Sequence, residues 1–235
     1  MGRAKKQSPS EEHFSGSLVG SPTKPLTQTV GRQLIEKGLI NMTPALLVID
    51  LQHWFFKIPV FSTPAGQAQL RSLISKTNEL IDLFYSQQLP IVHILTIHKR
   101  DGSTRDLWSK RNNSWALMEE SEDVQELSDI HRYETDLEII KTRSNAFLRT
   151  ELEVTLKQLT VDTLVITGYS TNRCVGITAV EACERDFDVI VSRDAILGPQ
   201  QNRVDAMLSV LRNEFGIEPI SNVRIMEQIS ALEEL

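Results

Sequence analysis

Short runs of branched apolar residues recur along the chain from Ala45 onward, each bounded by polar or turn-forming residues. Such runs are typical of strands that are buried on both faces of a parallel sheet. A further short segment after Pro219 predicts a last strand at the edge of the sheet. The predicted strands are ALLVI at 45–49, IVHILTI at 91–97, LEII at 137–140, TLVIT at 163–167, FDVIV at 187–191 and the edge strand at 221–223.

Between these strands, apolar residues repeat at the period of an amphipathic helix. Helices are predicted at 68–86, 150–159 and 204–215, and another follows Cys174. Strands that alternate with helices build βαβ units around a parallel sheet. The pattern therefore predicts an α/β fold: a three-layer αβα, Rossmann-like arrangement with a mostly parallel sheet of about six strands.

Two long segments lack this alternation. Residues 1–28 contain many Ser, Pro, Gly, Lys and Gln and few large apolar side chains, so they bury too little to offset the entropy of ordering. We expect a flexible N-terminal arm at 1–28, either solvated or packed on a neighbouring subunit, and one domain at 29–235. The polar stretch at 99–136 is too long for an ordinary connection and predicts a binding or lid region.

Composition excludes several classes of function. The net charge of -6, with both signs mixed along the chain, does not provide the basic stripe that nucleic-acid binding needs. No run approaches the roughly 20 apolar residues of a membrane span, and the first residues do not form a signal peptide. We expect a soluble cytoplasmic protein that binds neither nucleic acid nor membrane. CxxC pairs and the HExxH motif are absent, so the sequence predicts no metal.

The two cysteines need separate explanations. Cys174 and Cys183 lie on one predicted helix, where they are not placed to form a disulfide, and this usage suits a reducing compartment. Cys183 falls on the small-residue face of that helix, which favours a packing role. Cys174 falls at its start, where the helix dipole and a nearby ammonium would lower the pKa of a thiol.

Three reactive residues follow three of the predicted strands. Asp50 directly follows the strand at 45–49, Lys141 directly follows LEII, and Cys174 lies in GYSTNRC after TLVIT. Taken singly, each has an ordinary structural interpretation as a helix cap, a solvated charge or a small buried group. Because the carboxyl ends of parallel strands meet at one edge, where α/β folds bind ligands, we expect them to converge. A carboxylate, an ammonium and a thiol together favour acyl transfer through a covalent intermediate.

At this point the sequence resembles a known family. ALLVIDLQHWF, KTRSNAF and VITGYSTNRCV, in that order, are similar to the three signature blocks of the isochorismatase-like cysteine hydrolases. The resemblance covers roughly residues 43–199. It is specific because three blocks agree in their order and in their relation to the strands.

The resemblance implies a site and a mechanism. Asp50, Lys141 and Cys174 would be the catalytic group, and the peptide bond between Tyr169 and Ser170 would be cis. The backbone N–H groups of Ser170 and Cys174 would form the oxyanion hole. Asp50 would accept the thiol proton and later donate it to the leaving amine, while Lys141 stabilises the thiolate that attacks the carbonyl.

Other residues near these blocks have two interpretations each. Trp54, Phe55 and Tyr169 are expected to line the substrate pocket, with core packing as the equal alternative. Arg173 is interpreted as an exposed arginine at a helix start in preference to a ligand for a substrate carboxylate.

The chain also departs from the family pattern. Related nicotinamidases carry an Asp and His metal motif after the second strand, where this chain has His98 and Arg100. A metal-dependent nicotinamidase is therefore disfavoured, no cofactor is expected, and His98 is interpreted as a structural or wall residue. Asn145 replaces a serine that is common in the second block, which changes the pocket without changing Lys141.

These observations predict an enzyme that hydrolyses an amide or ureido C–N bond of a small molecule. Two alternatives remain: vinyl-ether hydrolysis of isochorismate, and a catalytically silent binding or assembly module of the same fold. The family resemblance also implies a homo-oligomer.

Overall fold

The computed structural model describes residues 42–234, which fold around one five-stranded sheet. Every pair of neighbouring strands is parallel, and the strand order is β3-β2-β1-β4-β5. The strands are β1 (Pro44–Ile49), β2 (Ile91–Thr96), β3 (Leu137–Lys141), β4 (Thr163–Tyr169) and β5 (Asp188–Leu197). These confirm the α/β fold and the five internal strands that the apolar runs predict.

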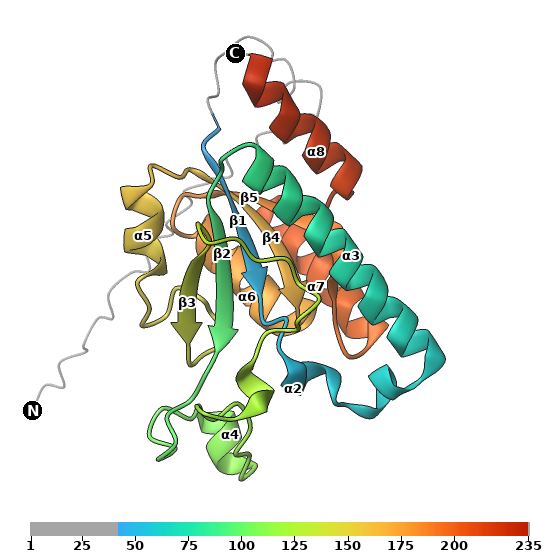
Figure 1. Cartoon of the computed structure of the whole chain (residues 1–235), viewed down its shortest axis with the longest axis vertical. Helices are drawn as coiled ribbons and strands as arrows, with labels where there is room; N and C mark the ends of the chain where they lie inside the picture. Colours follow the sequence, from blue (N-terminus) through green and yellow to red (C-terminus); the bar gives the residue numbers. More distant parts are fainter. Residues whose placement is uncertain (1–41, 235) are drawn as a thin grey trace, which may run out of the picture.

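Helices cover both faces of the sheet. They are α2 (His53–Phe56), α3 (Pro64–Ser86), α4 (Leu107–Arg111), α5 (Leu152–Gln158), α6 (Gly176–Cys183), α7 (Gln201–Phe215) and α8 (Asn222–Ser230). Short helical turns are η1 (Pro59–Ser62), η2 (Glu122–Val124), η3 (Thr171–Val175) and η4 (Ala231–Glu234). Figure 1 shows the strand arrows pointing toward the end of the molecule that carries α2 and α4.

The core has two layers because successive side chains of a strand point to opposite faces. In β1, Leu47 and Ile49 pack with buried residues of α5, α6 and α7, whereas Leu46 and Val48 pack with those of α3 and α8. All side chains of β1, β2 and β4 are buried, as expected of central strands in a parallel sheet. Cys183 is free and packs against the first layer, in agreement with its predicted packing role.

The predicted edge strand at 221–223 is wrong. Ser221 instead caps the start of α8, with its side chain accepting a hydrogen bond from the backbone N–H of Arg224. Ile225 and Ile229, four residues apart on that helix, are fully buried against α3 and the sheet. In the described part of the chain after Pro219, strand pairing is limited to a single parallel bridge between Ile220 and Ser192.

The long polar segment at 99–136 is ordered by contacts with the sheet. Its backbone forms hydrogen bonds with the residues that follow β1 and β2, including Leu127 N–H to the Leu51 carbonyl and His98 N–H to the Leu117 carbonyl. Within it lie α4 and η2, at the carboxyl ends of the strands (Figure 1). The segment is therefore placed beside the edge where the three reactive residues were expected.

Two further predictions concern the chain as a whole. The arm predicted at 1–28 lies outside the described residues, as does the start of the domain predicted at 29–235. Within residues 42–234, no helix is both long and apolar enough to cross a membrane.

Candidate active site

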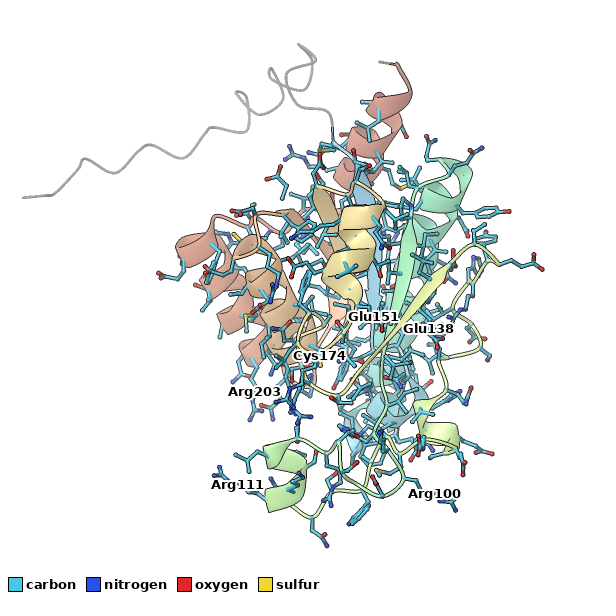
Figure 2. All side chains as sticks on the ribbon, turned by 90° about the vertical axis from the view of Figure 1, so that its left-hand side faces the viewer. Arg100, Arg111, Glu138, Glu151, Cys174 and Arg203 are labelled. Carbon is cyan, nitrogen blue, oxygen red and sulfur yellow. The ribbon has the colours of Figure 1, made fainter. Side chains whose placement is uncertain are left out.

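The structure brings the three predicted residues together at the carboxyl edge of the sheet. Asp50 follows β1, Lys141 ends β3, and Cys174 lies in η3 just after β4. The Lys141 Nζ atom is 2.6 Å from Asp50 Oδ2 and 3.5 Å from Cys174 Sγ. Asp50 is completely buried, Lys141 is 1% exposed and Cys174 is 6% exposed, so these groups meet in an environment nearly free of solvent. In Figure 2, Cys174 lies on the side of the molecule toward α4, the helix that carries Arg111.

Thr96 joins this group, although the sequence interpretation did not include it. Thr96 ends β2, and its residue partner on β3 is Lys141. The Thr96 hydroxyl donates to Asp50 Oδ1 at 2.8 Å and accepts from Lys141 Nζ at 2.5 Å. Strand order provides a signal for finding it: β2 lies between β1 and β3, so a polar residue at its end falls between Asp50 and Lys141.

The ammonium group of Lys141 has a partner for each of its three protons. Its hydrogen bonds go to Asp50, Thr96 and Cys174, and an ammonium has three donors and no acceptor. Burial on its own lowers the pKa of Lys141, but the negative charge of Asp50 and the sulfur of Cys174 outweigh it, and the net pKa is raised. Lys141 is therefore a permanent cation in this site at neutral pH.

The prediction that the helix start lowers the pKa of the Cys174 thiol is wrong. Burial disfavours the thiolate, the charge of Asp50 disfavours it further, and the opposing Lys141 ammonium is too weak to compensate, so the pKa rises to about 12. Cys174 also lies in a π-helical turn before α6 begins at Gly176, not in the first turn of that helix. In the resting site the sulfur carries its proton.

The turn before Cys174 has an unusual backbone. Gly168 has a φ of 116°, and a Cβ atom at this position would be only 2.1 Å from the carbonyl oxygen of Ile49. Glycine is required because β1 and β4 approach so closely here. One residue further on, the peptide bond between Tyr169 and Ser170 is cis. The Ser170 carbonyl accepts hydrogen bonds from the N–H groups of Arg173 and Val175, which holds the turn around Cys174.

Of the predicted wall residues, Tyr169 directly precedes this turn and Phe55 packs against Tyr169. The ring of Tyr169 is 5.5 Å from that of Phe55 and 5.2 Å from that of Phe56, and Tyr169 is buried in the core layer under α3. Burial raises the pKa of Tyr169 to about 12. Trp54, one residue before Phe55, is 36% exposed. Packing thus accounts for most of the surface of Tyr169, whereas Trp54 keeps a free face.

Arg173 connects the turn that carries Cys174 to the 99–136 segment, a contact that the sequence did not predict. Its Nε donates to Ser144 Oγ at 2.9 Å and its Nη2 to Asp106 Oδ2 at 3.1 Å, while the guanidinium lies 5.5 Å from the ring centroid of Trp108. The other oxygen of Asp106 caps α4 by accepting from Ser109 N–H. One carboxylate thereby fixes both α4 and the residue that precedes Cys174.

Comparison with known proteins identifies the family of this chain. The pattern of the isochorismatase domain matches residues 44–221. The chain belongs to the isochorismatase family. This family membership confirms the resemblance found in the three sequence blocks, and it places the chain among hydrolases.

Individual relatives of this isochorismatase-family chain have different descriptions. The N-carbamoylsarcosine amidase of an Arthrobacter species is 27% identical over 179 residues, which cover 74% of this chain and 66% of that protein. The probable inactive nicotinamidase of Arabidopsis thaliana is 29% identical over 163 residues, covering 64% of this chain and 79% of the relative. A crystal structure of a cysteine hydrolase from Pseudomonas syringae pv. phaseolicola 1448A superimposes with a TM-score of 0.73 at 21% identity, over 82% of this chain and 95% of that one.

The family member described here has no cluster of metal ligands in residues 42–234: no three His, Cys, Asp or Glu side chains are grouped to hold an ion. Arg100, at one position of the nicotinamidase motif, is exposed and forms an ion pair with Glu120. His98, at the other, is 5% exposed, and its Nδ1 has no hydrogen-bond partner among the described residues. Burial lowers the pKa of His98, with the Arg143 cation contributing, so its ring is neutral at physiological pH.

Proposed function

We propose that this isochorismatase-family protein is a cysteine-dependent hydrolase that cleaves the C–N bond of a small amide or ureido compound. The observation that carries the proposal is the contact of one buried ammonium, Lys141 Nζ, with both the Asp50 carboxylate and the Cys174 sulfur. A base, a cation and a nucleophile within hydrogen-bonding reach are the components of acyl transfer through a thioester. The amidases among the relatives support the same bond type.

The first chemical step follows from the protonation state of the thiol. Forming a free thiolate at pH 7 from a thiol whose pKa is about 12 would cost about 7 kcal/mol. In the proposed mechanism the proton therefore moves from Cys174 to Asp50 as the sulfur bonds to the substrate carbonyl carbon. Lys141 stays protonated and stabilises the negative charge on sulfur while the bond forms.

The carbonyl oxygen becomes an oxyanion in this step, and the proposed donors are the backbone N–H groups of Ser170 and Cys174. In support, Ser170 is the N-cap of the η3 turn that carries Cys174, so both N–H groups belong to the same short segment as the sulfur. Preorganised donors of this kind lower the activation barrier by about 3 kcal/mol. Trp54, Phe55 and Tyr169 are the proposed walls of the substrate pocket.

Collapse of the tetrahedral intermediate breaks the C–N bond, and Asp50 gives its proton to the departing nitrogen. The acyl group remains on Cys174 as a thioester. Water then attacks this carbonyl and gives a proton to Asp50, and the acid product leaves as the thiol is reprotonated. Asp50 thus alternates between base and acid, while Lys141 keeps its charge throughout.

The test is a screen for ammonia release from small amides and ureido compounds, with nicotinamide and N-carbamoylsarcosine in the panel. Wild-type protein is compared with Cys174→Ala and with the matched control Cys183→Ala. We expect turnover that falls at least about 10³-fold in Cys174→Ala and is unchanged in Cys183→Ala. Turnover retained in Cys174→Ala would refute the covalent mechanism.

The same variants separate the alternatives. Hydrolysis of the vinyl ether of isochorismate does not require a thiol nucleophile, so activity on isochorismate that survives Cys174→Ala would favour that reaction. A protein that turns over neither isochorismate nor any amide in the panel would favour the silent binding module. The relative described as inactive makes this control necessary.

A further inference from the structure

The hydrogen bonds of Thr96 have only one possible direction. An ammonium can donate but cannot accept, so the Thr96 hydroxyl must accept from Lys141 Nζ at 2.5 Å. Its single proton is then donated to Asp50 Oδ1, at 2.8 Å. Asp50 Oδ2 accepts from Lys141 directly at 2.6 Å. Lys141, Thr96 and Asp50 therefore form a closed ring of three hydrogen bonds.

We propose that Thr96 is a positioning residue that sets the direction of Lys141 and Asp50 toward Cys174. The inference rests on the proposed function, because it assigns Thr96 a part in the same reaction. By accepting one ammonium proton, Thr96 leaves Lys141 with one proton for Asp50 and one for the sulfur. By donating to Oδ1, it fixes the rotation of the carboxylate that receives the thiol proton.

The side chain of Thr96 is itself held rigidly. Gln52, which is fully buried, accepts a hydrogen bond from Thr96 N–H at 2.9 Å and donates to the Thr96 carbonyl at 3.1 Å. The same Gln52 amide also donates to the Val124 carbonyl at 2.7 Å. A β-branched side chain on a fixed backbone has few rotamers, so the hydroxyl is directed at the other two groups. A chain of contacts thus runs from the 99–136 segment through Gln52 and Thr96 to the nucleophile.

Loss of the Thr96 hydroxyl would remove one hydrogen-bond partner from each of two buried charged groups, Lys141 and Asp50. One Lys141 proton and one Asp50 oxygen would have no partner in a site that water hardly enters, so both side chains would reorient. Loss of a supporting hydrogen bond to a metal ligand lowers activity by about 10- to 100-fold, and we expect a loss of similar size here. Substrate binding would change little, because Thr96 is not among the proposed wall residues.

The test uses Thr96→Val, which keeps the shape without the hydroxyl, and Thr96→Ser, which keeps the hydroxyl. The control is Thr77→Val, a buried threonine on α3 whose hydroxyl has no partner among the described residues. On the panel amide that wild type hydrolyses, kcat should fall about 10- to 100-fold in Thr96→Val with KM within about threefold. Thr96→Ser and Thr77→Val should remain near wild type.

The two proposals fail in different ways. A wild-type kcat in Thr96→Val would overturn the inference alone, as would a Thr96→Ser variant as slow as Thr96→Val. If no panel amide releases ammonia, the proposed function fails on those compounds, and Thr96 is then tested by alkylation of Cys174 with iodoacetamide at pH 8.5 in a Cys183→Ala background. Several-fold slower alkylation in Thr96→Val than in Thr96→Ser supports the inference, and equal or faster alkylation overturns it. Melting temperatures of all variants show whether the fold is intact.

Discussion

The protonated resting state of Cys174 predicts how the stability of the protein depends on pH. In the unfolded chain the thiol ionises near its ordinary value of 9.0, whereas in the folded protein its pKa is about 12. Between these values the folded state holds a proton that the unfolded state has released. The free energy of unfolding must therefore fall as pH rises above about 9, and the stabilisation is complete only below that pH.

The loss of unfolding free energy can be calculated from the interval between the unfolded and folded pKa values of Cys174. One bound proton changes the free energy of unfolding by about 1.4 kcal/mol per pH unit, so the window from 9.0 to about 12 corresponds to about 4 kcal/mol. Between pH 8 and pH 10.5 the loss is about 2 kcal/mol. The pKa of Lys141 is also raised, from 10.5, so its own loss of stability has the same sign and begins at still higher pH.

The assay is urea unfolding at intervals between pH 8 and pH 10.5, in a Cys183→Ser background with and without Cys174→Ser. Serine does not titrate in this range, so the difference in the free energy of unfolding between the two proteins isolates the thiol of Cys174. Between pH 8 and pH 10.5, we expect the protein with Cys174 to lose about 2 kcal/mol of unfolding free energy relative to the Cys174→Ser protein. A constant difference, or a shift in its favour, would show that the fold does not hold the thiol in its protonated form, and the mechanism that begins from the thiol would be wrong.

Two further predictions follow from the same region. At pH 7.5 iodoacetamide should alkylate Cys183 faster than Cys174, because Cys174 is 6% exposed and its pKa is strongly raised. Peptide mass mapping measures the rates of alkylation of both cysteines. Faster labelling of Cys174 would contradict a buried, protonated thiol. Gly168→Ala should cost more than about 3 kcal/mol of unfolding free energy or prevent folding, because its Cβ would be 2.1 Å from the Ile49 carbonyl oxygen. Gly216→Ala, with a φ of 68° and no atom within 4 Å, is the matched control and should cost about 1 kcal/mol by urea unfolding. Equal losses in the two glycine variants would refute the argument from close approach.

The sequence alone was enough to predict the α/β fold and the convergence of Asp50, Lys141 and Cys174. The reason is that apolar runs buried on both faces mark central parallel strands, and such strands end at a common edge. A residue directly after a strand is therefore positioned by chain direction alone, without knowledge of side-chain contacts. The edge strand at 221–223 failed because a serine before a short polar and apolar segment can begin a helix equally well, and only the packing of Ile225 decided the outcome.

Only the tertiary structure identified Thr96 and the charge state of the thiol. Thr96 continues an apolar strand in the sequence, and its role appears once β2 is known to lie between β1 and β3. The pKa of Cys174 depends on burial and on the distances to Asp50 and Lys141, which no local pattern encodes. Chain direction fixes which residues reach an edge, whereas solvent exclusion and three-dimensional distance fix what their charges are, because electrostatic energies depend on the surroundings of a group and not on its place in the chain.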